Sequence, residues 1–400
     1  MTDGVVGEFP LDQVRRDTPG VNEVIHFNNC GSALPPTCVV EAVINHVQRE
    51  ATIGGYEAED EAQDRLNAVY TSTAELINAK PSEVAIVENA TRAWDMAVYG
   101  YKFKKGDRVL TCRAEYVSNV IALLQLQERH QIEIVLIEDD EYGQIDLAHL
   151  EKELRVGAEM VALTHIPTSG GLVNPAQEVG ALCEAYETFY VLDACQSIGQ
   201  VPINVQEIGC DVLSATSRKY LRGPRGVGFL YVKNSALDRI EPPFLDLHAA
   251  TWTNDTEYEI TEGAKRFENW ETNFAGKLGL GAAIDYALNL SIEVTSSRLR
   301  SLAEILREAL TEIEVVTVHD QGKEKGGIVT FSVKGFEAET VSRELNKQKI
   351  NTSTTSPNNA RYDLAHRGVP GVVRASTHYY NTQEEIDSFI SAVKELDNNQ

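Results

Sequence analysis

The 400-residue chain predicts an α/β protein, with a mostly parallel central sheet sandwiched by helices and a smaller α+β C-terminal unit. Short apolar runs alternate with longer helical patterns from about residue 83 to 232. Most of these runs are continuously apolar and rich in Val, Ile and Leu, as is typical of strands buried on both faces. Beyond about residue 274 the pattern changes to a long helical stretch followed by isolated strand and helix signals.

The expected elements follow in order along the chain. The strands of the central sheet are "EVAIVE", "RVLTC", "IEIVLIE", "MVALTHI", "FYVLDA", "DVLSA" and "VGFLYV", with helices between them such as 117–130 and 175–188. Then come a helical stretch at about 274–313, the strand "GGIVTFSV", a helix near 337–348, the strand "GVVRAS" and a last helix from 382. This order predicts an N-terminal arm (1–25), a large domain (26–270) and a small domain with a long connecting helix (271–400).

Composition narrows the class of function. A net charge of −24 argues against nucleic acid as a partner, because binding to phosphates needs a basic face. The sequence has neither a signal-peptide core nor an apolar run long enough to cross a bilayer, so we expect a cytoplasmic protein with no membrane partner. The six cysteines lack CxxC spacing, which predicts reduced thiols and no metal site. A small-molecule substrate fits this profile.

Polar residues gather where the predicted parallel strands end. The clusters lie at 89–91, 112–116, 165–169, 193–196 and 214–219. Ligands of open parallel sheets bind at the carboxyl ends of the strands. Polar residues also end strands in proteins without a site there, but five such clusters together predict one shared crevice.

One lysine stands out within these clusters. Lys219 lies in "ATSRKYLRGPRGVGFLYV", where neighbouring arginines and burial would lower its pKa and leave part of the amine neutral. Asp193 closes the apolar strand "FYVLD", and a buried carboxylate there needs a cationic partner. The protonated ring nitrogen of pyridoxal phosphate is such a partner, and Gln196 can donate to its phenolic oxygen. The alternative is a basic surface loop on an acidic protein.

The stretch "VLDACQSIGQVPINVQEIGCDVLSATSRKYLRGPRGVGFLYV" resembles the core signature of the class V aminotransferase family. That family includes cysteine desulfurases, selenocysteine lyases and isopenicillin-N-epimerase-like proteins. The similarity extends from "HFNNCGSALPP" to "VVRASTHYYNTQEEID". The resemblance implies a pyridoxal-phosphate enzyme of fold type I that acts on a small-molecule amino-acid substrate and forms homodimers.

The resemblance also implies a role for individual residues. Lys219 would be the Schiff-base lysine and, with Tyr116, one of two catalytic residues. Asn28 and Gly31 would lie beside the substrate, and Arg374 would bind its carboxylate. The implied cofactor-binding residues are Ala90, Thr91, Tyr116, Thr168, Asp193, Gln196, Thr216, Arg218 and Lys219.

The reaction is less narrowly defined than the cofactor. Desulfurases of this family carry a sulfur-accepting cysteine upstream of the carboxylate-binding arginine, and the corresponding stretch here, 350–376, contains none. This absence counts against a persulfide-relay desulfurase. We expect β-elimination at a carbon–sulfur bond of a cysteine-derived substrate, begun by Lys219 taking the α-proton. Epimerisation, with Tyr116 as proton donor, and transamination stay open as alternatives, as does a cofactor-free binding protein.

Overall fold

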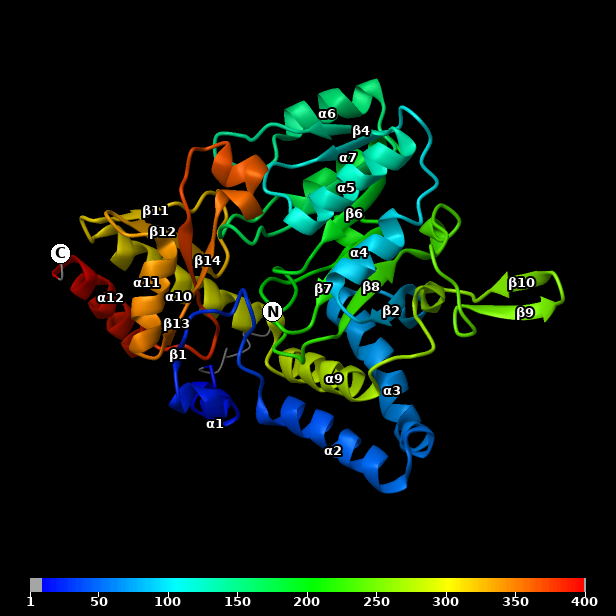
Figure 1. The fold of residues 1–400 in the computed structure, drawn as a ribbon, viewed down its shortest axis with the longest axis horizontal. Coiled ribbons are helices and arrows are strands. Elements are labelled where there is room, and N and C mark those ends of the chain that lie inside the picture. Colours follow the sequence, from blue (N-terminus) through cyan, green and yellow to red (C-terminus); the bar gives the residue numbers. More distant parts are fainter. Residues whose placement is uncertain (1–8, 399–400) are drawn as a thin grey trace, which may run out of the picture.

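The computed structural model describes residues 9–398, so the first eight residues of the predicted N-terminal arm lie outside the described residues. Its centre is a seven-stranded sheet in the order β2-β8-β7-β6-β5-β3-β4 (Figure 1). All its strands are parallel except β8, which pairs antiparallel with β2 and β7. The strands are β2 (Val84–Val87), β3 (Arg108–Thr111), β4 (Glu133–Leu136), β5 (Met160–Thr164), β6 (Phe189–Asp193), β7 (Val212–Thr216) and β8 (Gly228–Val232). They confirm the predicted strands and the mostly parallel sheet.

Helices cover both faces of this sheet, as predicted. Alternate strand residues explain why: Leu110 and Leu192 join a core cluster with one set of helices, whereas Val109 and Val191 join a second cluster that contains Trp94. The helices of this part are α2 (Thr37–Ile53), α3 (Gly55–Ile77), α4 (Ala90–Val98), α5 (Val117–His130), α6 (Leu147–Val156), α7 (Ala176–Ala185) and α8 (Val205–Ile208). α4 and α5 belong to the second cluster, and α3, α6 and α7 to the first.

The C-terminal part is built on a four-stranded antiparallel sheet in the order β11-β12-β15-β14. Its strands are β11 (Val316–Val318), β12 (Ile328–Val333), β14 (Ser353–Thr355) and β15 (Val372–Ser376), and its helices are α11 (Ala338–Lys347) and α12 (Gln383–Asn398). The prediction of a single connecting helix at 274–313 is wrong. This stretch forms two helices, α9 (Phe274–Asn289) and α10 (Ile292–Thr311), because Ser291 adopts a left-handed φ of 62° and its hydroxyl caps α10.

The N-terminal segment lies against the C-terminal part. After α1 (Leu11–Arg16), β1 (Ile25–His26) pairs in parallel with β13 (Ile350–Asn351). Phe27 then packs edge-on against Phe389, with ring centroids 5.2 Å apart. This pairing joins residues more than three hundred positions apart in the sequence. The domain limits at residues 25 and 270 stay a prediction.

A hairpin extends from the body of the molecule (Figure 1). It is formed by β9 (Ala250–Asn254) and β10 (Glu257–Ile260). The remaining short elements are 3₁₀ helices at Pro19–Asn22, Pro81–Glu83, Asn234–Ala236, Ala264–Phe267 and Pro357–Asn359, and a π-helix at Arg361–Ala365. Across residues 9–398, each helix is too short or too polar to cross a membrane.

Candidate active site

The carboxyl ends of β5, β6 and β7 and the N-termini of α4 and α5 surround a cavity of about 190 Å³. All five predicted strand-end clusters contribute to its lining, and so do all nine residues predicted to bind the cofactor. The parallel sheet explains this convergence, because strands that point the same way end at the same edge. The lining residues are Asn89, Ala90, Thr91, Tyr116, Thr164, Ile166, Thr168, Asp193, Cys195, Gln196, Thr216, Arg218, Lys219 and Gly226.

Lys219 lies in the turn after β7, with only 8% of its surface exposed. Burial lowers the pKa of its amine, and the Arg218 guanidinium lowers it further, against the opposing influence of Cys195 and Asp193. Its Nζ forms no hydrogen bond or ion pair within residues 9–398. An amine with a lowered pKa and no partner can act as a base or react with an aldehyde.

Asp193 closes β6 and is held from two sides. Its Oδ1 accepts the backbone N–H of Cys195 at 2.8 Å, and its Oδ2 accepts Asn119 Nδ2 at 2.9 Å. Asn119 Nδ2 also donates to Glu115 Oε1 at 2.9 Å, so one amide joins the two carboxyl groups. These two hydrogen bonds orient Asp193 at the cavity wall, where its carboxylate can pair with a bound cationic group.

Glu115 and Asn119 support the site but were not predicted from the sequence. Both are buried, and Glu115 also accepts hydrogen bonds from the hydroxyls of Thr111 and Thr164. Burial raises the pKa of Glu115 to about 7, and the nearby charge of Asp193 adds to the rise. The sequence feature that could have indicated Glu115 is an acidic residue inside the polar cluster at 112–116, because glutamate is rare at a buried strand end.

The N-terminus of α4 forms another wall of the cavity. Asn89 caps the helix by accepting the backbone N–H of Arg92 at 2.9 Å, and the exposed Thr91 begins its first turn. β8 passes so close that a Cβ on Gly228 would lie 2.4 Å from the carbonyl oxygen of Ala215 and 3.2 Å from the backbone nitrogen of Ala90. Thr216 and Arg218 line the same cavity, so a helix N-terminus and a guanidinium are available to one anion.

Arg374, on β15, reaches the cavity through Thr168. Its Nη1 donates to the carbonyl oxygen of Thr168 at 2.9 Å and to its hydroxyl at 2.5 Å. Gln196 Nε2 donates to the same hydroxyl at 3.3 Å and to the carbonyl oxygen of Cys30 at 3.0 Å. Arg374 Nε and Gln196 Oε1 are buried without a partner among the described residues. Two polar atoms at this end of the site are thus left for a bound molecule.

Asn28 and Gly31 do not line the cavity but lie behind its wall. The Arg218 guanidinium donates to the carbonyl oxygen of Gly31, and Asn28 pairs with Ser376 in an isolated parallel bridge. Asn28 Oδ1 is buried and has no partner within the described part of the chain. A Cβ on Gly31 would lie 2.4 Å from that oxygen, so the glycine lets the Asn28 side chain fold back over the turn.

These residues fit pyridoxal phosphate. The cavity offers an amine for the aldehyde at Lys219, a fixed carboxylate for the ring nitrogen at Asp193, and an anion site between α4 and Arg218. The unpartnered atoms of Lys219, Gln196 and Arg374 provide an independent reason to expect a bound group, because buried polar atoms are normally hydrogen-bonded.

Comparisons with known proteins agree with this geometry. The family model described as aminotransferase class-V matches residues 25–389. A probable cysteine desulfurase of Pyrococcus abyssi is 30% identical and covers 96% of this chain and 97% of its own length. The apo cysteine desulfurase of Thermococcus onnurineus is 28% identical, with a TM-score of 0.91 over 98% of this chain and 99% of that one.

A third comparison shows the fold alone. The cystine C-S lyase C-DES, solved with its product cysteine persulfide, has a TM-score of 0.85 and 23% identity over 94% of this chain and 99% of its own. The Pyrococcus abyssi and Thermococcus onnurineus relatives are both named as cysteine desulfurases, whereas the stretch 350–376 of this chain contains no cysteine. The family match, over nearly the whole chain, confirms the resemblance. The chain belongs to the class V aminotransferase family and is a pyridoxal-phosphate enzyme of fold type I.

Proposed function

We propose that this chain cleaves a carbon–sulfur bond of cysteine or a cysteine-derived amino acid by β-elimination. The observation that carries the proposal is the cavity in which Lys219 and Asp193 meet, with the Arg374 guanidinium at its edge. A base, a carboxylate for a cationic ring and a carboxylate-binding fork are the groups that chemistry at the α-carbon of an amino acid needs.

Each residue has a proposed role in that chemistry. Pyridoxal phosphate supplies an electron sink that weakens the bonds to the substrate α-carbon. The neutral fraction of the Lys219 amine would accept the α-proton, and Asp193 would keep the ring nitrogen of the cofactor protonated. Arg374 orients the substrate through its carboxylate, with Asn28 and Gly31 beside it. Gln196 and Thr168 would contact the ring oxygen, Tyr116 would lie against the ring, and the phosphate would be held by Ala90, Thr91, Thr216 and Arg218.

Cysteine desulfuration is a second candidate, which the names of the relatives favour. The pairing of β1 with β13 also brings Cys30 Sγ to 4.0 Å from Ser353 Oγ, in the stretch where the family cysteine is missing. In that reaction the substrate sulfur passes to a thiol as a persulfide, and the substrate leaves as alanine. In β-elimination the substrate takes up water and leaves as pyruvate and ammonia, while the sulfur departs as a thiol.

We further propose that the enzyme is a homodimer. The segment from 244 to 270 exposes five large apolar or aromatic side chains, an unusual density for a surface that faces water. These residues are Phe244, Leu247, Trp252, Tyr258 and Trp270. A second copy of the chain would cover them.

Product analysis with cofactor-loaded enzyme tests the reaction. L-Cysteine and an S-alkyl cysteine are the substrates, and pyruvate, ammonia, alanine and thiol are measured. β-Elimination predicts pyruvate and thiol. Alanine together with a persulfide on Cys30 would instead indicate desulfuration and overturn the proposed β-elimination. We expect Lys219→Ala to keep the fold and abolish turnover, and Lys105→Ala, at an exposed lysine, to leave turnover unchanged. Full turnover in Lys219→Ala would overturn the assignment of the base.

A further inference from the structure

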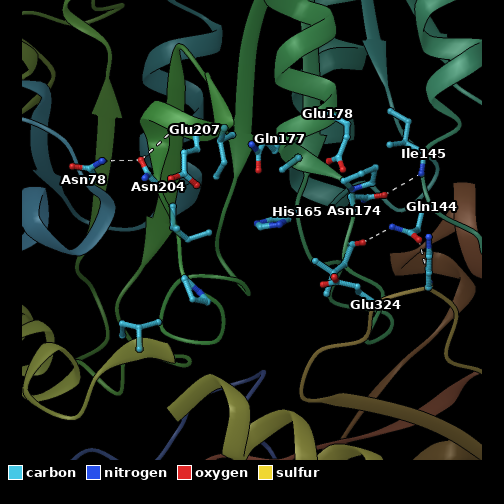
Figure 2. Close-up of a pocket in the computed structure, with 18 of the residues that line it drawn as sticks. Asn78, Gln144, Ile145, His165, Asn174, Gln177, Glu178, Asn204, Glu207 and Glu324 are labelled. Atoms are coloured by element: carbon cyan, nitrogen blue, oxygen red, sulfur yellow. Dashed lines mark hydrogen bonds between the residues drawn. The ribbon is translucent and has the colours of Figure 1, made fainter. Parts of the chain in front are cut away.

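A second, larger cavity lies away from the active site. Its volume is about 1130 Å³, and its walls come from the segment 140–148, the starts of α7, α8 and α10, the end of α3, and the loop at 323–324 (Figure 2). It shares no lining residue with the active-site cavity. The two cavities lie on opposite sides of one short stretch, because Thr164 and Ile166 line the active site whereas His165 lines the larger cavity.

The larger cavity is strongly acidic. Its lining includes two aspartates and five glutamates, whereas Lys323 is the single lysine or arginine among the lining residues. The glutamates are Glu75, Glu178, Glu207, Glu293 and Glu324. Glu324 forms an ion pair with Arg300 at 2.8 Å, outside the lining. The carboxylates of Glu178 and Glu207 form no ion pair and no hydrogen bond within residues 9–398. Their negative charges are left to water or to a ligand.

The floor of the cavity holds a histidine without a partner. His165 is 7% exposed, and neither of its ring nitrogens forms a hydrogen bond within residues 9–398. Figure 2 shows its ring turned toward the space that Gln177, Glu178 and Glu324 surround. Buried polar groups of this kind are normally satisfied, as are those of the neighbouring Gln144 and Asn174.

The protonation of His165 defines what it can bind. Burial lowers its pKa to about 4, although the Glu324 carboxylate acts in the opposite direction. The imidazole is therefore neutral at pH 7 and offers one nitrogen as an acceptor. A neutral acceptor surrounded by carboxylates matches a donor that carries a positive charge and N–H groups.

We propose that this cavity binds a small organic polyamine, with one ammonium N–H donated to the His165 imidazole and the other ammonium groups facing Glu178 and Glu207. The size of the cavity suits a flexible small molecule, since ligand cavities run to about 1,000 Å³. A metal ion fits less well, because no three His, Cys, Asp or Glu side chains within residues 9–398 are placed to ligate one. The proposal does not depend on the reaction catalysed at Lys219.

Two dications with the same spacer test the hydrogen bond. 1,6-Diaminohexane and its fully N-methylated form, hexamethonium, carry the same charge at pH 7, but only the diamine has N–H groups. Isothermal titration of the full chain at low ionic strength should give saturable binding of the diamine, roughly tenfold tighter than that of hexamethonium, as expected for one hydrogen bond to a buried acceptor. Equal binding of the two dications, or no saturable binding of the diamine, would overturn the proposal.

Matched variants test the place of binding. The double variant Glu178→Gln/Glu207→Gln should weaken diamine binding by roughly tenfold or more, whereas Glu128→Gln/Glu314→Gln, which removes two exposed charges elsewhere, should leave it unchanged. His165→Leu should abolish the preference for the diamine over hexamethonium. Equal losses in the two double variants would show that the binding follows the net charge of −24 and not this cavity, and would refute the assignment.

Discussion

At the scale of single residues, the site depends on how neighbouring groups set the protonation of two side chains. Burial and Arg218 lower the pKa of Lys219, so that part of its amine is neutral. Asp193 is held by Asn119 and by the backbone of Cys195, which leaves its orientation no freedom. The base and the carboxylate thus lie ready in one cavity before a cofactor binds.

Arg374 should determine substrate affinity more than turnover. A planar guanidinium binds a carboxylate through two parallel hydrogen bonds, which a lysine cannot reproduce. We expect Arg374→Lys to raise KM by roughly tenfold with a smaller change in kcat, and Arg374→Ala to raise it further. Arg343→Lys, at an exposed position on α11, is the matched control. Steady-state kinetics on the loaded enzyme measure both constants, and an unchanged KM in Arg374→Ala would remove the assigned role.

Glu115 should give the protein a pH-dependent stability. Because burial raises its pKa to about 7, the folded state keeps a proton that the unfolded state releases above about pH 4.3. Stability is therefore lost as pH rises from about 4.3 through about 7, by at most roughly 4 kcal/mol at about 1.4 kcal/mol per pKa unit.

The variant Glu115→Gln cannot ionise and should lack this part of the pH dependence. Thermal unfolding at pH 5 and pH 8 measures it: the wild-type protein should lose more stability between the two values than the variant does. Glu128→Gln, at an exposed glutamate on α5, should keep the wild-type slope. The same pH dependence in wild type and Glu115→Gln would contradict the prediction.

Most residues that line the cavity were predicted from the sequence, whereas the residues that hold Asp193 in place were not. Lys219, Asp193 and Gln196 were found because strand ends and a lysine turn are local signals. Glu115 and Asn119 were not, because their role depends on a hydrogen bond to Asp193 from a residue 74 positions away. Cys30 is 323 positions away from Ser353 in the sequence, and the pairing of β1 with β13 brings the two together.

At the scale of elements, the site depends on the close approach of β8 to the N-terminus of α4. A Cβ at Gly228 would lie 2.4 Å from the carbonyl oxygen of Ala215, a backbone atom that cannot move without disturbing the β7–β8 pairing. The central strands could be predicted because burial on both faces leaves a continuous apolar run. The break between α9 and α10 could not, since Ser291 is an ordinary residue in a helical pattern until its φ of 62° is known.

Gly228→Ala should therefore destabilise the protein by about 1–3 kcal/mol, as overpacking does. It should also weaken the binding of pyridoxal phosphate, because the backbone of Ala90 moves with the strand. Gly55→Ala is the control, since nothing lies within 4 Å of a Cβ there. Thermal unfolding and cofactor titration measure both effects, and a Gly228→Ala protein as stable as wild type would show that the strand yields without cost.

At the scale of the whole molecule, the protruding β9–β10 hairpin is the feature that a single chain does not explain. Trp252 is 77% exposed and Tyr258 56% exposed. The family resemblance predicted a homodimer, and the sequence alone did not indicate which surface would form it, because burial between chains leaves the same apolar signal as burial within one.

We expect the protein to sediment at twice its chain mass of 44.2 kDa. Trp252→Glu/Tyr258→Glu should shift it toward the monomer without unfolding it, because the two charges would be buried without partners at the interface. Val156→Glu, at an apolar residue that is exposed outside the hairpin, should leave the dimer intact. A hairpin variant that sediments like the wild type would place the interface elsewhere.

We propose above that the enzyme cleaves a carbon–sulfur bond in the cavity at Lys219. The most direct measurement is proton NMR of the loaded enzyme in deuterated water, with L-cysteine, an S-alkyl cysteine and alanine as substrates. The proposal predicts pyruvate and a free thiol from the S-alkyl cysteine, and no fragmentation of alanine. Exchange of the α-proton for deuterium in all three amino acids, without release of sulfur from either cysteine substrate, would contradict it and indicate an epimerase.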